Sequence, residues 1–332
     1  MERIRTSVRL PSGTPIETFR AAARMAETAG FDQIWTGNDL FRRSGIVPVA
    51  IALDSTERIS IGSSVLNPVS LHPAEIAMIA SNLQELSGGR YLLGMGAGSE
   101  VFLRWAGLEP DAPVTRTSQG IRAVRALLDG LSPADRPRTG GGWMPQAKLK
   151  DGPARPTPIY LGGMGPKMLE LGGRLADGVL ALALPPERYA WIAERVEAGA
   201  AGREIDIACS IWIAIDDDPA MARGILAEKI AIYAGSLSRD ALEQAGLDVD
   251  RFQDVQRLMS AGDTAGAVAL VDDGMLRLGI AGDATTVIDR CAELVAAGVR
   301  HLSFGQPLGA RPLDAIAFLG ERVLPRFAKE FA

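Results

Sequence analysis

Residues 158–180 read PIYLGGMGPKMLELGGRLADGVL, which places a strand, a glycine turn, a helix and the start of another strand in one short stretch. The run 159–161 favours a buried strand, because aromatic and β-branched residues fit a pleated, half-buried surface. Pro166 suits the first turn of a helix, where its missing N–H group costs little. Between them, glycines let the backbone approach a ligand closely or adopt a positive φ angle. These glycines are Gly162, Gly163 and Gly165.

The turn 162–167 has the features of an anion site. A helix N-terminus preceded by glycines presents free amide donors and the positive end of the helix dipole, which together suit a phosphate group. Lys167 adds a point charge next to them. The spacing alone is equally compatible with a tight turn whose glycines serve packing only. The rest of the chain has to decide between these two interpretations.

The composition is that of a globular protein. Of 332 residues, 47% are hydrophobic and 23% are charged, which is enough for a large core. The net charge of −5 provides no basic surface for nucleic acid. Cys209 and Cys291 lack the spacing and the partners of a metal site or disulfide framework, so we expect both in the core. With no apolar run of membrane-spanning length and no targeting segment, a soluble cytoplasmic protein is expected.

Short apolar runs alternate with helical patterns along the chain, which is typical of repeated βα units and a parallel sheet. Amphipathic periodicity predicts helices at 16–29, 73–87, 117–129, 186–199, 284–297 and 312–328. The predicted strands are 3–10, 31–36, 59–66, 91–96, 158–162, 178–184, 205–215 and 300–305. Eight strands indicate a closed (β/α)8 barrel, with its site at the carboxyl ends of the strands.

The first strand departs from the pattern of its neighbours. Arg3, Arg5, Ser7 and Arg9 alternate with apolar residues, although a strand buried on both faces should be continuously apolar. Either its polar side faces the barrel mouth, or its first residues lie outside the barrel.

Two stretches interrupt the alternation and are expected to be insertions within a single barrel domain, 1–332. Residues 132–157 are rich in proline and glycine and predict a long loop over one end of the barrel. Residues 217–281 carry mostly helical patterns and form the largest insertion, between strands seven and eight.

Polar and small residues follow three of the predicted strands. Strand three runs through 61–68, strand four ends in 93–100 with three glycines and a carboxylate, and strand two ends in 34–39 with an amide and a carboxylate. Because the ends of parallel strands meet at one rim, we expect these residues to converge.

In these motifs the sequence resembles the luciferase-like flavin and deazaflavin oxidoreductases, and within them the branch of methylenetetrahydromethanopterin reductase and related coenzyme F420-dependent enzymes. The resemblance extends from residue 30 to residue 309 and is weakest in 217–281. The most specific segments are 63–68, 87–90, 94–98 and 162–167, in that order.

The resemblance implies a (β/α)8 barrel that binds an isoalloxazine-like ring at its mouth, and a non-prolyl cis peptide after strand three, here Ser64–Val65. For the ring it implies Asn38, Ser63, Ser64, Val65 and Asn67, with Gly96, Ala97 and Gly98 letting the backbone pass beside the cofactor. For the phosphate of the cofactor tail it implies Gly162, Gly163, Met164, Gly165 and Lys167.

One motif departs from the family pattern. Related deazaflavin enzymes often have Asp-His where this chain has Asn38-Asp39, so a proton relay through histidine cannot operate here. Asn38 retains a donor and an acceptor for a ring carbonyl or hydroxyl. Asp39 and Glu100 are the candidate catalytic residues, as a base or a substrate anchor. The alternative for Asp39 is an ordinary solvated carboxylate.

The remaining candidates favour structural roles. His72 stands in a His-Pro pair at a helix start, which favours capping, and His301 begins a strand, which favours burial. Trp35 suits ring stacking or the core equally well. So few histidines make a catalytic metal improbable, and no Gly-x-Ser-x-Gly motif indicates a nucleophile.

The leading hypothesis is hydride transfer between coenzyme F420 and an unidentified small organic substrate. One alternative is an FMN-dependent monooxygenase, since a flavin can form a peroxide with oxygen. Another is a non-catalytic flavin- or deazaflavin-binding protein. A sugar-phosphate barrel enzyme ranks last, because its phosphate site would follow strands seven and eight. By analogy with the family we expect a homodimer, with no nucleic-acid or membrane partner.

Overall fold

Nine parallel strands form the sheet of the computed structural model, which describes residues 3–151, 156–237 and 239–330. They are β1 (Arg5–Leu10), β2 (Gln33–Thr36), β3 (Ser60–Leu66), β4 (Tyr91–Gly96), β5 (Ile159–Gly162), β6 (Gly178–Leu182), β7 (Asp206–Ile215), β8 (Gly279–Gly282) and β9 (His301–Leu308). The sheet closes because β1 pairs with β9, β9 with β7 and β7 with β6. Eight strands therefore form the barrel, and β8 lies outside that circle.

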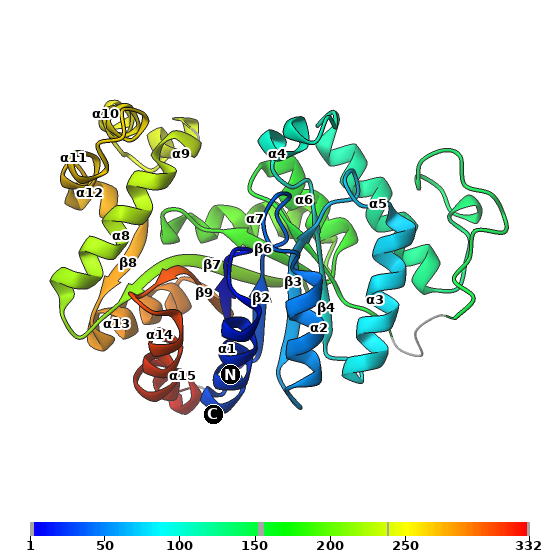
Figure 1. Ribbon diagram of the computed structural model, residues 1–332, viewed down its shortest axis with the longest axis horizontal. Helices are drawn as coiled ribbons and strands as arrows, with labels where there is room; N and C mark the ends of the chain where they lie inside the picture. Colours follow the sequence, from blue (N-terminus) through cyan, green and yellow to red (C-terminus); the bar gives the residue numbers. More distant parts are fainter. Residues whose placement is uncertain (1–2, 152–155, 238, 331–332) are drawn as a thin grey trace.

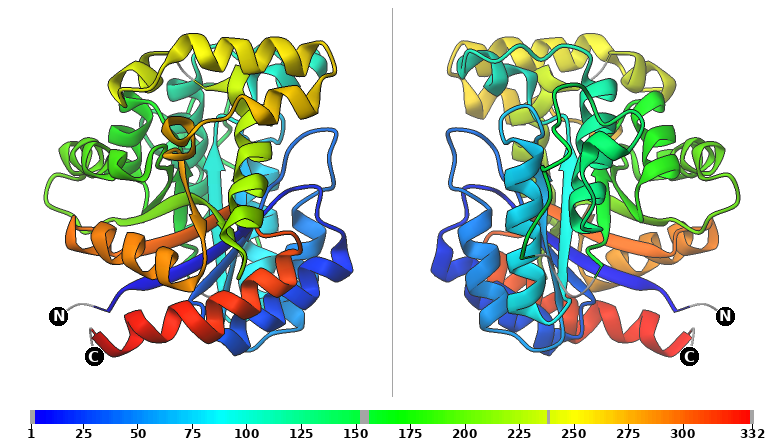
Figure 2. Two further views of the ribbon diagram at one scale, coloured as in Figure 1. Left: turned by 90° about the vertical axis from the view of Figure 1, so that its left-hand side faces the viewer. Right: turned by 90° about the vertical axis from the view of Figure 1, so that its right-hand side faces the viewer.

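Helices surround the barrel and also lie above the ends of its strands, as Figures 1 and 2 show. They are α1 (Ile16–Ala29), α2 (Ile46–Asp54), α3 (Pro73–Ser87), α4 (Glu100–Trp105), α5 (Pro113–Leu128), α6 (Pro166–Leu175), α7 (Tyr189–Ala200), α8 (Pro219–Tyr233), α9 (Arg239–Gln244), α10 (Val249–Ser260), α11 (Thr264–Ala269), α12 (Asp273–Leu276), α13 (Ala284–Ala296), α14 (Pro312–Phe318) and α15 (Leu324–Glu330). Shorter turns are η1 (Pro133–Asp135), η2 (Pro186–Arg188), η3 (Ala234–Ser236) and the π-helical η4 (Leu319–Val323).

The prediction of a (β/α)8 barrel is confirmed, and all eight predicted strands are present within a few residues. Helices α1 and α3 have the predicted bounds, because each ends at a glycine in the left-handed conformation, Gly30 and Gly88. The predicted packing of Cys209 and Cys291 in the core is also confirmed, since both are buried. Within the described part of the chain, no helix combines the length and the apolar character that crossing a bilayer requires.

The excursion after β7 contains more than helices. Its final residues form β8, which pairs with Trp212–Ile215 beside the half of β7 that β6 does not reach. Helices α8 to α12 bury a second cluster around Leu226, Ile230 and Phe252, which Trp212 and Ala214 of β7 join from the barrel. Figures 1 and 2 show these helices grouped at the top of the molecule, on the side where the strands end. Residue 238 of the predicted insertion lies outside the described residues.

The described residues of the loop 132–157, which are 132–151 and 156–157, do not lie over an end of the barrel, contrary to the prediction. They pack along the outside of α3, where Trp143 contacts the His72 ring and the Ser81 hydroxyl donates to the Asp151 carbonyl. Figure 1 shows them at the far right, beyond α3 and α5. The loop joins α5 to β5, so it starts and ends away from the strand tips. Residues 152–155 of it lie outside the described residues.

The polar side of β1 faces the barrel interior along its whole length, and only Arg9 reaches the mouth. Arg5 pairs with Asp206 at 2.7 Å, and the Ser7 hydroxyl lies 2.8 Å from Nε2 of His301. Neither sequence-based interpretation of this alternation was complete. A barrel interior accepts polar side chains where nearby strands, here β9 and β7, carry complementary groups.

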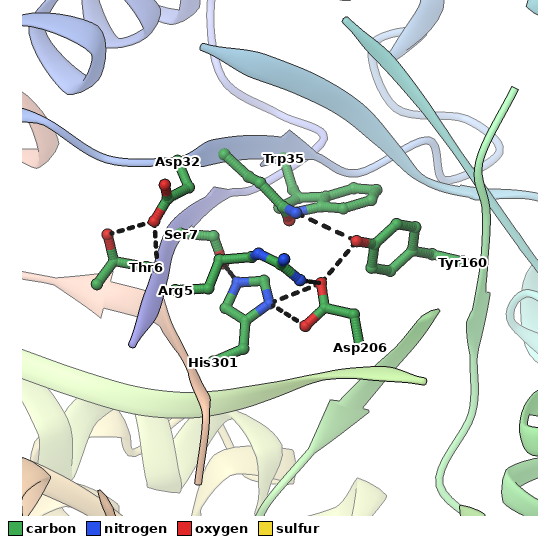
Figure 3. A network of polar contacts seen from close by, with 9 residues as sticks. Arg5, Thr6, Ser7, Asp32, Trp35, Tyr160, Asp206 and His301 are labelled. Carbon is green, nitrogen blue, oxygen red and sulfur yellow. Dashed lines mark hydrogen bonds and ion pairs between the residues drawn. The ribbon is translucent and has the colours of Figure 1, made fainter. Parts of the chain in front are cut away.

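Those groups form a buried network at the lower end of the barrel (Figure 3). The Asp206 carboxylate accepts a 2.6 Å hydrogen bond from the Tyr160 hydroxyl and lies 2.9 Å from Nδ1 of His301. Burial alone would raise the pKa of the Asp206 carboxyl. His301, Arg5 and Tyr160 together outweigh it and hold that pKa well below its usual range. The predicted burial of His301 is confirmed, because 1% of it is exposed.

An aromatic layer separates this network from the mouth. Trp35 is fully buried and packs against Tyr160, with ring centroids 5.0 Å apart, so the core interpretation of Trp35 is confirmed. Glycines on adjacent strands make room for both rings, because a Cβ atom at Gly62 or Gly178 would lie about 2 Å from them. The barrel interior is therefore closed below the mouth.

Candidate active site

The mouth of the barrel contains a cavity of about 750 Å³ at the carboxyl ends of β1, β3, β4, β5 and β6. It brings together most of the residues that the sequence predicted for a cofactor site. The predicted residues that line it are Asp39, Ser64, Val65, Ala97, Gly98, Gly162, Gly163, Met164, Gly165 and Lys167.

Val65 forms one wall of this cavity. The peptide bond before it, Ser64–Val65, is cis, as the resemblance implied. The Val65 side chain fits between the ends of β4 and β5 because both strands end in glycine. A Cβ atom at Gly162 would lie 2.6 Å from Cγ1 of Val65, and one at Gly96 would lie 3.0 Å from Cγ2. Gly96 and Gly162 therefore seat the Val65 side chain.

The turn after β5 leaves backbone donors open to the cavity. In the described part of the chain, the amides of Met164, Gly165 and Lys167 have no protein acceptor. The side chains of Met164 and Lys167 are exposed, and a Cβ atom at Gly165 would meet nothing within 4 Å. The three glycines of this turn do not adopt positive φ angles. Gly162 and Gly163 are needed because the side chains of Val65 and Met168 lie close to them, and not because of an unusual backbone conformation. Open space surrounds Gly165.

Three predicted ring contacts have protein partners instead of lining the cavity. The Asn38 side chain accepts a 2.9 Å hydrogen bond from the Gly45 amide, which fixes the loop before α2. The buried Ser63 hydroxyl lies 2.8 Å from the Tyr91 hydroxyl. The Asn67 amide donates to the Ala97 carbonyl at 2.5 Å. These residues shape the rim from behind the cavity wall.

The two candidate carboxylates are separated by the structure. Asp39 lines the cavity, where its Oδ2 accepts a 2.6 Å hydrogen bond from the Ser12 hydroxyl. Glu100 pairs with Arg104 one turn later on α4, with 66% of its side chain exposed. It lines an adjoining pocket of about 200 Å³, which shares Ala97 and Gly98 with the main cavity.

Arg9 is the main residue that the sequence analysis missed. Its guanidinium donates to the Ser64 hydroxyl at 2.7 Å and to the Ser210 hydroxyl at 3.3 Å, and it lines the cavity. Burial lowers the pKa of this guanidinium, and the Asp39 carboxylate partly opposes that effect. The alternation of Arg5, Ser7 and Arg9 was the available signal. Other lining residues not predicted are Ser99, Pro113, Val114, Pro166, Met168, Leu180 and Leu182.

An exposed aromatic cluster stands at the rim beside the cavity. Phe41, Phe102 and Trp105 pack together with ring centroids 5.2 to 6.4 Å apart. Phe41 and Trp105 are about two-thirds exposed, at 65% and 67%. Phe41 lies two residues after Asp39, so this cluster offers an apolar surface next to the polar cavity.

The remaining candidates have structural roles. Nδ1 of His72 accepts a hydrogen bond from the Ala74 amide at 3.2 Å, so the capping interpretation is confirmed. Among the described residues, no three His, Cys, Asp or Glu side chains gather as a metal site would require. The cavity thus combines an aliphatic wall, a row of amide donors, a partly buried arginine and one carboxylate. This arrangement is suited to binding a flat, partly anionic ligand, and it lacks the features of a site for nucleophilic catalysis.

Sequence comparisons relate this chain to enzymes of the luciferase-like family. The sequence model of the luciferase-like monooxygenase family matches residues 3–301. The chain is 31% identical over 320 residues to 5,10-methylenetetrahydromethanopterin reductase of Methanolobus tindarius, covering 93% of this chain and 96% of that protein. It is 29% identical to F420-dependent glucose-6-phosphate dehydrogenase of Microbacterium testaceum, over 93% of this chain and 92% of that one.

Solved structures extend the comparison. The coenzyme F420-dependent tetrahydromethanopterin reductase of Methanopyrus kandleri superposes with a TM-score of 0.91 at 28% identity, covering 98% of this chain and all of that one. More distant structures show the fold alone. Among them is the oxygenating component of a Baeyer–Villiger monooxygenase of Pseudomonas putida in complex with FMN, at 17% identity and a TM-score of 0.70, over 98% of this chain and 99% of that one.

Proposed function

Because this chain belongs to the luciferase-like monooxygenase family and is an F420-dependent oxidoreductase within it, we propose that hydride passes between coenzyme F420 and a small organic substrate at the barrel mouth. The substrate itself is not identified, since the relatives named above are a pterin reductase and a sugar-phosphate dehydrogenase. The chain is therefore an enzyme whose specificity depends on residues outside the shared cofactor motifs.

One observation carries the proposal: a single cavity contains both the Val65 wall and the open amides of the turn 162–167. A flat ring suits the aliphatic wall, and an anionic tail suits amides at a helix N-terminus. The donors are unpaired in the described chain, and a side chain at Gly165 would project into free space. The residues present therefore fit the cofactor.

When bound, F420 supplies a deazaflavin ring that exchanges a hydride and is restricted in practice to two-electron transfer. The protein positions the reactants. Val65 supports the ring from behind, and Gly162 leaves the space that this support needs. Arg9 holds the Ser64 hydroxyl in place and puts a positive charge beside the ring. The leucines at 180 and 182 exclude water from the inner side of the mouth.

The two carboxylates have different proposed tasks. Asp39 is held by the Ser12 hydroxyl within the cavity, so it is the group that accepts or returns a proton near the reacting atoms. Glu100 stands over the adjoining pocket at the rim, where it anchors part of the substrate. Asn38, Ser63, Asn67 and Gly96 are proposed to position the ring site from behind. A single domain and a homodimer stay predictions.

A titration with each cofactor tests the proposal. Purified protein is titrated with F420 and, separately, with FMN, and binding is followed by absorbance and fluorescence. We expect saturable F420 binding at lower concentration than any response to FMN. Tight FMN binding without a response to F420 would favour the monooxygenase alternative.

Replacing Gly165 with alanine is expected to weaken F420 binding about tenfold, equivalent to about 1.4 kcal/mol. The added methyl group meets no protein atom within 4 Å, so it would take up room in the cavity that Gly165 lines beside the unpaired amides. Loss of one charge-assisted contact accounts for that magnitude. The measurement is the dissociation constant by fluorescence titration, with the urea midpoint as a check on folding.

Gly141→Ala is the matched control for this change. Gly141 also has nothing within 4 Å and no positive φ angle, but it lies on the loop outside α3. Its substitution should leave F420 affinity unchanged. Equal affinities of the two variants would remove the turn 162–167 from the proposed site.

A further inference from the structure

A second cation stands near the mouth, on the opposite side of the barrel from Val65. The Lys229 ammonium of α8 lies 3.3 Å from Oε1 of Gln306 and 4.0 Å from the ring centroid of Tyr233. It also lies 5.5 Å from the Trp212 ring centroid. Helix α8 belongs to the excursion after β7, so Lys229 is supplied by a segment outside the repeated βα units.

Strand register puts Lys229 at the level of Arg9. Trp212 of β7 pairs with Gly305 of β9, next to Gln306, and Val8 of β1 pairs with Phe304. Arg9 therefore stands beside the residues that Lys229 contacts. Arg9 also donates to Ser210, which precedes Trp212 on the inward face of β7. The two cations thus approach the same part of the mouth from β1 and from α8.

Neither cation forms a direct ion pair with a carboxylate within the described part of the chain, although the Asp39 carboxylate partly compensates the charge of Arg9 from a longer distance. Both are partly buried, and the polar contacts of each are to neutral oxygen atoms. Burial first, and the charge of Arg9 second, lower the pKa of the Lys229 ammonium to about 8. Two like charges at a partly buried site are unfavourable unless a negative group joins them.

We propose that Arg9 and Lys229 form a cationic subsite that binds a carboxylate or phosphate group of the substrate on the β7–β9 side of the mouth. This inference rests on the proposed function, and it names the substrate class as anionic. An anion here would satisfy both charges at once, and charge-assisted bonds to it are stronger than neutral ones. The buried Trp212 ring lies on one side of Lys229, and the partly exposed Tyr233 ring leaves the subsite open to a ligand from solvent.

The experiment measures anion binding directly by calorimetry, with inorganic phosphate and acetate as probes. Protein saturated with F420 is compared with free protein, so that the cofactor occupies the amides of the turn 162–167. We expect phosphate or acetate to bind the saturated protein. Lys229→Met should weaken that binding at least about tenfold, as expected for loss of a charged partner. Lys229→Arg, which keeps the charge, should retain most of it.

Lys150→Met is the control, because Lys150 is an exposed lysine on the loop outside α3 and should not affect either probe. Absence of binding in both protein forms, or unchanged binding in Lys229→Met, would overturn the proposal. Anion binding that disappears when F420 is added would place the probe at the amides of the turn 162–167 and would also overturn the proposal. If F420 does not bind at all, the proposed function fails, while the free protein still reports on the subsite.

Discussion

Replacing Asp206 with asparagine should lower the free energy of unfolding by about 3 kcal/mol, because it removes the acceptor shared by two buried groups, Tyr160 and His301, and the half-exposed Arg5. Arg5, Tyr160 and His301 all direct polar hydrogens at this one carboxylate. An amide accepts fewer bonds and carries no charge, so Arg5 loses its ion pair, and Tyr160 and His301 lose a hydrogen bond to a charged acceptor. Urea unfolding followed by circular dichroism measures the effect.

The pH profile identifies the cause of this loss. The folded-state pKa of Asp206 is lowered, so its contribution is present above the unfolded-state pKa of about 4 and is lost as the pH falls below it. The difference in stability between wild type and Asp206→Asn should therefore shrink below about pH 4. Asp314→Asn removes an exposed pair with Arg311 and should cost less than about 1 kcal/mol. A pH-independent difference for Asp206→Asn would contradict the electrostatic explanation.

Gly162→Ala should reduce F420 affinity more than tenfold and also destabilise the fold by about 1–3 kcal/mol, the usual cost of overpacking. The new Cβ atom would lie 2.6 Å from Cγ1 of Val65, so either β5 or the Val65 side chain has to move. Both define the proposed ring wall. Fluorescence titration gives the affinity, and urea unfolding gives the stability.

The double variant Gly162→Ala with Val65→Ala separates the two effects. Removing the branched side chain relieves the clash, so the stability should recover towards that of Val65→Ala alone. The affinity should stay low, because the aliphatic wall is gone. Full recovery of affinity in the double variant would show that Val65 does not support the ring.

The repeated βα pattern predicted the barrel well because each strand and helix has its own periodicity. Short elements without such a signal were missed. Strand β8 reads Gly-Ile-Ala-Gly, which has no run of strand-forming residues. It forms because the second half of β7, with which β6 does not pair, has a free edge for hydrogen bonding. The loop 132–157 has no periodicity, so its path along α3 depends on tertiary contacts such as that of Trp143 with His72.

The candidate site was predictable where a backbone motif creates it, as in the turn 162–167 and at Val65. The site was less predictable where the hydrogen-bond or ion-pair partner of a side chain depends on the folded structure. The Asn38 side chain accepts a hydrogen bond from the Gly45 amide, and Glu100 forms an ion pair with Arg104 on its own helix. Both partners depend on local geometry. Lys229 gave no sequence signal, because its neighbours Gln306 and Trp212 are distant in the chain.

The excursion that carries Lys229 leaves and rejoins the barrel at one point. The amide of Asp216, directly after β7, donates to the carbonyl of Gly282, the last residue of β8, at 3.2 Å. Because the two ends of this segment are hydrogen-bonded to each other, a different segment grafted between these two residues keeps the barrel frame if it still covers Trp212 and Ala214 of β7. Exchange of this segment would then change the proposed substrate subsite while the cofactor site at Val65 and the turn 162–167 is kept.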